Sequence, residues 1–93
     1  MTIGVLYLDL AMPESRSLKD RRRAVKSLKE RIQNRFNASV AELGDPDLWQ
    51  SAMLAVCIIG NDVRHVNSQL SSVAAFAGQD HRAVLTDYRI EML

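Results

Sequence analysis

The stretch IGVLYLDLAM, residues 3–12, has the two-residue alternation of a half-buried β-strand. Its large apolar residues share one side, and they are Leu6, Leu8, Leu10 and Met12. Val5, Tyr7 and Asp9 fall on the other side. Because Pro13 lacks the N–H that a central strand needs, we expect the strand to end before it.

A helix is predicted after this strand. Ser17 is a good N-cap residue, and Asp20 follows three residues later, as in a capping box. Asn37 tolerates the left-handed backbone conformation and is expected to end the helix. The apolar residues at helical spacing between these ends are Leu18, Val25, Leu28, Ile32 and Phe36.

A β-hairpin is predicted next. Residues 38–43 alternate weakly, the turn-forming residues 44–47 follow, and residues 52–59 form an apolar run. Trp49, which lies just before this run, is expected to cap the edge of the core.

A second helix and a last strand complete the chain. Asn61 or Asp62 is expected to cap the helix, and Gly78 is expected to end it. Residues 82–93 alternate again and predict a strand with one solvated face. The helix between them has an apolar stripe made of Val63, Val66, Leu70, Val73 and Ala77.

The resulting order of elements is βαββαβ, in one domain that spans residues 1–93. This order matches the split βαβ or ferredoxin-like arrangement. We therefore expect an α+β fold with a four-stranded antiparallel sheet and both helices on one face. Right-handed crossovers place the strands at 3–12 and 52–59 in the centre of the sheet.

The face of the sheet that the helices leave open is predicted to be apolar. Its expected members are Val5, Tyr7, Met53, Ala55 and Cys57. Because a contiguous apolar patch usually marks an interface, we expect the chain to form a homodimer through this face.

The composition narrows the class of protein. A chain of 93 residues that is 47% apolar and 25% charged is typical of one globular domain, too small for a deep catalytic cavity. One cysteine and two histidines exclude a disulfide framework and a zinc site of repeated Cys/His pairs, so no metal or cofactor is expected. The sequence has no signal-peptide pattern and no apolar run near the ~20 residues that span a bilayer. We expect a cytoplasmic protein without a membrane partner.

The net charge of +1 conceals a strong segregation of charge. Residues 16–35 contain nine basic and two acidic residues, a local charge of +7. The remainder contains three basic and nine acidic residues, a charge of −6. On a helical wheel, Arg22, Lys26 and Lys29 form one flank of the first helix, and Lys19 and Arg23 lie on its outer side.

The basic helix favours binding of a polyanion. Four cations, at positions 19 and 21–23, lie at the positive end of the helix dipole, where exposed cations are unfavourable. The acids that would support the flank at i, i+4 are expected to be missing. A region that breaks local rules without compensation indicates function. We predict a non-enzymatic RNA- or ribosome-associated protein that contacts phosphates through Arg16, Lys19, Arg22, Arg23, Lys26 and Lys29.

Other functions stay open. The aromatic signature of an RRM and the GXXG loop of a KH domain are absent, so any RNA contact is expected to be to phosphate or shape. The basic run is alternatively a solvated helix face, or it docks an acidic protein partner in an interaction or oligomerisation module. A third alternative is an enzyme whose site is shared across a dimer and uses Asp47, Asp62 or His65.

Several short strings along the chain point to one family. They are RSLKDRRR (16–23), RFNASVAE (35–42), DLWQ (47–50), GND (60–62) and YRIE (88–91). Together they resemble the uncharacterised bacterial YlxP-like family over essentially the whole chain. The resemblance implies a small cytoplasmic ferredoxin-like domain, often encoded near translation-initiation and ribosome-maturation genes, with no established activity. The turn at 44–46 departs from the Asp-His-Gln-like turn of many members, so no role for that histidine carries over.

Overall fold

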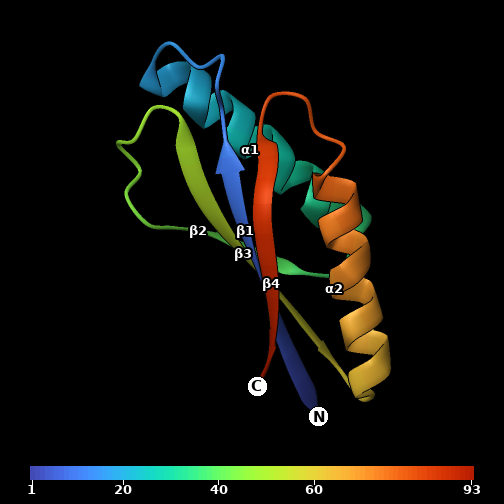
Figure 1. Ribbon diagram of the computed structural model, residues 1–93. Coiled ribbons are helices and arrows are strands. Elements are labelled where there is room, and N and C mark those ends of the chain that lie inside the picture. The colour runs from blue at the N-terminus through green and yellow to red at the C-terminus, as the bar shows by residue number, and fades with distance from the viewer.

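The sheet and the helices have the predicted ferredoxin-like α+β arrangement in the computed structural model, which describes residues 1–93. The four strands form one antiparallel sheet in the order β2-β3-β1-β4, with both helices on one face (Figure 1). The elements are β1 (Thr2–Ala11), α1 (Leu18–Arg35), β2 (Ser39–Leu43), β3 (Ser51–Gly60), α2 (Val63–Ala77) and β4 (Val84–Met92).

One hydrophobic core lies between the sheet and the helices. The predicted alternation of β1 is confirmed, because Leu6, Leu8, Leu10 and Met12 are all buried. The inward stripe of α1 is confirmed at Val25, Leu28 and Ile32. Full burial of a side chain such as Leu28 stabilises the fold by about 1.5 to 3 kcal/mol. The residues that α2 contributes are Val66, Leu70, Val73, Ala74 and Ala77, whereas Val63 of the predicted stripe is exposed at the first turn.

The start of α1 is capped as predicted. The Ser17 hydroxyl accepts a hydrogen bond of 3.1 Å from the Asp20 N–H. The Asp20 carboxylate in turn accepts a 3.1 Å bond from the Arg16 N–H. One N–H group that a helix start leaves without a partner, that of Asp20, is therefore satisfied, and the residue before the cap is fixed as well.

The end of α1 differs from the prediction. The helix stops at Arg35, and Phe36 has an extended backbone with φ of −122°. No residue other than glycine has a positive φ, so the expected left-handed Asn37 is wrong. Phe36 packs against the core and meets the ring of Phe76 edge-on at 5.8 Å. This packing turns the chain directly toward β2 and replaces the left-handed cap.

The ends of α2 agree with the sequence analysis. The Asp62 carboxylate accepts a 3.0 Å bond from the Arg64 N–H, so Asp62 rather than Asn61 is the cap. Gly78 follows the last helical residue, and its N–H donates to the Ala74 carbonyl. Neither α1 nor α2 is both long enough and apolar enough to cross a membrane.

The loop between β2 and β3 is held by the Arg21 side chain of α1. Gly44 has a φ of +83°, and the Asp45 side chain accepts the Asp47 N–H at 2.9 Å. Trp49 is 56% exposed, so the expectation that it caps the core edge is wrong. The place beneath the loop is taken by Arg21, which bonds to the carbonyls of Asp45 and Ser51.

Candidate nucleic-acid interface

A groove of about 490 Å³ runs between one flank of α1 and the edge strand β2. Arg22, Lys26 and Lys29 lie on the α1 side because positions i, i+4 and i+7 share a flank of a helix. The remaining lining residues are Arg21, Val25, Glu30, Gln33 and Glu42, of which only Glu42 comes from β2.

The cations of the groove are weakly neutralised. Lys26 Nζ lies 3.9 Å from Glu30 Oε1, and both side chains are mostly exposed. This i, i+4 pair corrects the expectation that no acid supports the flank, but such a pair contributes only about 0.3 to 0.5 kcal/mol. Arg22 and Lys29 form no salt bridge. The groove therefore presents cations that an anion can reach.

The other three predicted phosphate contacts lie outside this groove. Arg23 lines a separate polar hollow together with Glu14, Asp20 and Arg82. Arg16 precedes α1, and Lys19 is exposed in its first turn. The structure thus brings Arg22, Lys26 and Lys29 together and leaves Arg16, Lys19 and Arg23 apart from them.

Arg21 is a buried structural side chain rather than a surface cation. Only 1% of it is exposed, and its Nη1 lies 2.7 Å from Glu42 Oε1. Its Nε donates to the Ser51 carbonyl at 3.0 Å, and its Nη2 donates to the Asp45 carbonyl at 3.4 Å. The guanidinium suits this position because it offers several donors in a fixed plane. The expectation that Arg21 crowds the exposed helix start is therefore wrong.

The sequence carried a signal for Arg21 that was missed. Arg21 precedes Val25 and Leu28 by four and seven residues, which places it on the inward stripe. Glu42 carried no such signal, because its partner lies on another element and their pairing depends on how α1 packs over β2. Its carboxylate is on the groove wall opposite the cations, with 30% of the side chain exposed.

The predicted interface residues share the open face of the sheet. Val5 pairs with Cys57 and Tyr7 pairs with Ala55 across β1 and β3, so these four side chains are neighbours. All four are half-buried in the single chain, and Met53 is 36% exposed. The set is contiguous on the two central strands.

The β4 side of the open face is charged. The Arg89 guanidinium carbon lies 3.9 Å from the centre of the Tyr7 ring, a cation–π contact. The Tyr7 hydroxyl donates to Glu91 at 3.4 Å, and Arg89 Nη1 lies 3.5 Å from the same carboxylate oxygen. Arg89 therefore covers one side of the Tyr7 ring and closes that side to a stacking base.

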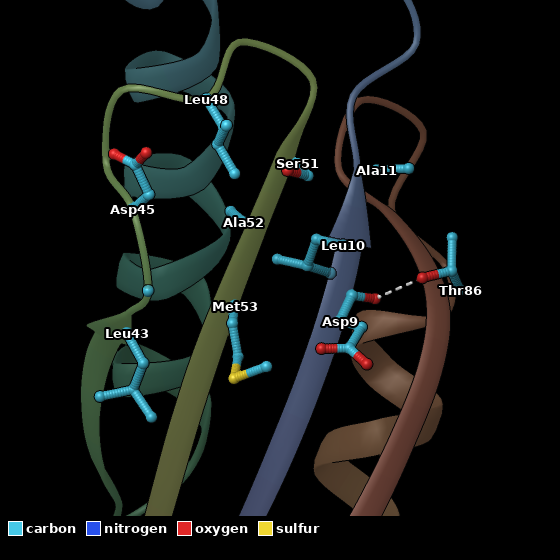
Figure 2. Close-up of a pocket in the computed structure, with 11 residues that line it drawn as sticks. Asp9, Leu10, Ala11, Leu43, Asp45, Leu48, Ser51, Ala52, Met53 and Thr86 are labelled. Atoms are coloured by element: carbon cyan, nitrogen blue, oxygen red, sulfur yellow. Dashed lines mark hydrogen bonds between the residues drawn. The ribbon is translucent and has the colours of Figure 1, made fainter.

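A second hollow, of about 370 Å³, lies at the end of the open face next to the β2–β3 loop. Figure 2 shows Leu43, Met53 and Asp9 on three neighbouring strands, with Leu48 reaching toward them from the loop. Thr86 donates to the Asp9 carbonyl at 3.1 Å where the register of β1 and β4 shifts (Figure 2). The lining is mostly apolar. No group of three or more His, Cys, Asp or Glu residues is arranged to hold a metal ion.

The residues of the enzyme alternative are dispersed within one chain. Asp47 precedes β3, whereas Asp62 and His65 follow it. The 10 residues of β3 separate the two ends by roughly 30 Å at about 3.3 Å per residue. Asp47 therefore lies out of hydrogen-bond reach of Asp62 and His65 in a single chain.

Comparison with known proteins identifies relatives of this chain. A family described as "Protein of unknown function (DUF503)" matches residues 3–90. The "Uncharacterized protein YlxP" of Bacillus subtilis (strain 168) is 30% identical over 74 residues, which cover 80% of each chain.

Two designed proteins resemble the chain in structure. Foldit4 has a TM-score of 0.55 and 10% identity, over 100% of this chain and 97% of its own. Ferredog-Diesel has a TM-score of 0.51 and 12% identity, over 98% of this chain and 84% of its own. At this identity the likeness concerns the fold alone.

Proposed function

We propose that this chain, which belongs to the DUF503 family of proteins of unknown function, is a non-enzymatic RNA-binding or ribosome-associated protein of the cytoplasm. The observation that carries the proposal is the row of Arg22, Lys26 and Lys29 along one groove, with a single exposed ion pair of 3.9 Å among them. In this function the three side chains contact RNA phosphates.

The energetic argument concerns the mutual repulsion of these cations. Like charges at i, i+4 destabilise a helix slightly, and a phosphate placed between them removes that repulsion. Each contact also releases condensed counterions, which favours association at low salt. Contacts of this kind position an RNA without reading its sequence.

The test is the salt dependence of binding, measured by fluorescence anisotropy with a short single-stranded RNA. The affinity should fall by about 0.7 log units per log unit of salt for every phosphate contacted. In the variant Arg22→Ala/Lys26→Ala/Lys29→Ala the slope should flatten by roughly 2 log units, at one phosphate per side chain.

The matched control removes the same charge outside the groove, as Arg16→Ala/Lys19→Ala/Arg23→Ala. This variant should keep most of the salt slope, because its three side chains do not line the groove. The proposal fails if the unmutated protein does not bind RNA at low salt or if both variants lose the same slope. Binding to polyglutamate in place of RNA would favour an acidic protein partner.

We further propose that a second copy of the chain covers the open face, as a homodimer. Val5, Ala55 and Cys57 form its apolar centre, and Arg89 lies between Asp87 and Glu91 along β4. This alternation of charge lets two copies pair opposite charges around a two-fold axis. Val5→Lys should give a monomer with unchanged helicity, as measured by light scattering and circular dichroism. A monomeric unmutated protein at high micromolar concentration would contradict the dimer.

A further inference from the structure

The groove has a fixed carboxylate on the wall that faces its cations. We infer that it holds a single RNA strand and favours bases that carry an exocyclic amino group, through a hydrogen bond to Glu42. The inference rests on the proposed function and names the class of RNA that the groove accepts.

The charges of the two walls differ in sign. Arg22, Lys26 and Lys29 come from α1, whereas Glu42 stands on β2 across from them. One row of phosphates can follow the α1 wall. A second row of phosphates, as in a duplex, would approach Glu42 and meet no free cation, because the Arg21 guanidinium there is already paired. The groove therefore suits one strand, with its phosphates on α1 and its bases directed toward β2.

The Glu42 carboxylate is held in place by the buried Arg21 guanidinium. Its Oε1 lies 2.7 Å from Arg21 Nη1, and Arg21 is itself fixed by two backbone carbonyls. With 30% of the Glu42 side chain exposed, its second oxygen can face a ligand. Arg21 thus acts as a positioning residue, and a group fixed in this way makes a more specific contact than a mobile one.

The chemistry of a carboxylate decides which bases fit. An ionised carboxylate only accepts hydrogen bonds. Cytosine presents an N4 amino donor, whereas uracil presents an acceptor oxygen at the same position. A single strand exposes these edges, which a duplex occupies in base pairing. Cytosine should therefore be favoured over uracil, which the phosphate contacts alone do not predict.

The experiment compares oligo(C) and oligo(U) of equal length, each titrated with the full chain in low salt and followed by fluorescence anisotropy. We expect oligo(C) to bind about 5- to 10-fold more tightly, the lower end of what one specific base contact provides. An RNA duplex of the same length should bind more weakly than oligo(C). Equal affinity for the two oligonucleotides, or tighter binding of the duplex, would overturn the inference.

Two variants identify the residue responsible. In Glu42→Gln the amide oxygen can replace Oε1 as acceptor for Arg21, which leaves the amino group to donate into the groove. The preference for oligo(C) should then vanish or reverse. Glu30→Gln removes the same charge from the groove without touching Arg21. It should strengthen binding of both oligonucleotides and keep their ratio.

The outcomes separate the inference from the proposed function. Salt-dependent binding without a preference for oligo(C) keeps the proposed function and removes the inference. Absence of RNA binding removes both. A Glu42→Gln variant that retains its denaturation midpoint and the full preference also removes the inference. If that variant does not fold, the unmutated protein still tests the inference. Its relative affinity for oligo(C) and oligo(U) and its weaker binding of the duplex are then the deciding measurements.

Discussion

Arg21 and Arg22 are adjacent, identical in chemistry and opposite in role. Arg21 is 1% exposed and makes contacts to Glu42, Asp45 and Ser51. Arg22 is exposed, has no salt bridge and lines the groove. One residue step turns a helical side chain by about 100°, from the core side to the groove flank. The basic run of α1 therefore contains two kinds of side chain, buried and exposed, which the sequence alone does not distinguish.

Other basic residues of α1 also make structural contacts, as Arg21 does. Arg31 pairs with the nearly buried carboxylate of Asp80, and Arg35 stacks 5.2 Å from the centre of the Phe76 ring. The local charge of +7 thus overstates the charge that a ligand can meet. The cations without such structural contacts are concentrated on the groove flank and the outer side of α1.

The strongest test of this contrast replaces each of the two neighbours by alanine. Arg21→Ala leaves Glu42 and two loop carbonyls without their donor and should cost about 3 to 5 kcal/mol of unfolding free energy. Arg22→Ala should change it by less than about 0.5 kcal/mol. Urea denaturation measures both, and similar midpoints for the two variants would refute the distinction.

The inward stripe of α1 is expected to show the next largest effect. Leu28→Ala and Ile32→Ala each remove a side chain that is 0% exposed and should cost about 2 to 5 kcal/mol. Lys26→Ala, on the exposed flank of the same helix, is the matched control and should cost less than about 0.5 kcal/mol. Unchanged denaturation midpoints in Leu28→Ala and Ile32→Ala would show that the stripe is misplaced.

A smaller effect is expected at Asp80, and it depends on pH. Burial acts to raise the pKa of Asp80, but the N–H groups of Arg82 and Ala83 and the guanidinium of Arg31 outweigh it and lower the pKa below 3.8. The stabilising contribution of the ionised Asp80 carboxylate is therefore complete well above that value and is lost as the pH falls through the folded-state pKa.

The variant Asp80→Asn tests this contribution. It should be less stable than the unmutated chain by about 1 kcal/mol at neutral pH, because the ion pair with Arg31 is lost. The difference should shrink over the acid range below about pH 5. Thermal unfolding across that range checks the slope, and a difference that grows in acid would contradict the assignment.

The smallest effect is expected from the groove itself. The variant Arg22→Ala/Lys26→Ala/Lys29→Ala removes three like charges and one weak pair with Glu30. Its unfolding free energy should stay within about 0.5 kcal/mol of the unmutated value. A large destabilisation would mean that these side chains support the fold, and weaker RNA binding by this variant would then not test the proposed phosphate contacts.

Most of the fold could be predicted because its strands, helices and helix caps depend on residues that are close together in the sequence. The alternation in β1 and the stripe at Val25 and Leu28 follow from periods of two and 3.6 residues, and the Ser17 cap follows from a side chain that can accept a hydrogen bond from the helix start. The error at Asn37 came from a conformational preference that the packing of Phe36 overrides.

The candidate site was predicted only in part. Its α1 wall follows from helical spacing, which the sequence displays. Its other wall does not, because Glu42 faces the groove only when α1 packs over β2 and Arg21 reaches beneath the loop. Such a contact depends on tertiary packing. An arginine on an inward stripe is the sign that a charged partner must be buried nearby.

The contacts of Arg21 also have a consequence for the order of events in folding. They join α1 to residues 24 and 30 positions further along the chain. We expect these bonds to close only after β2 and β3 have paired and docked, because the Ser51 and Asp45 carbonyls belong to the segment that joins and begins these strands. A contact that forms late leaves the folding rate nearly unchanged and slows unfolding. In stopped-flow measurements, Arg21→Ala should therefore unfold faster, with little change in its folding rate. The Arg21 side chain thus prolongs the lifetime of the native state.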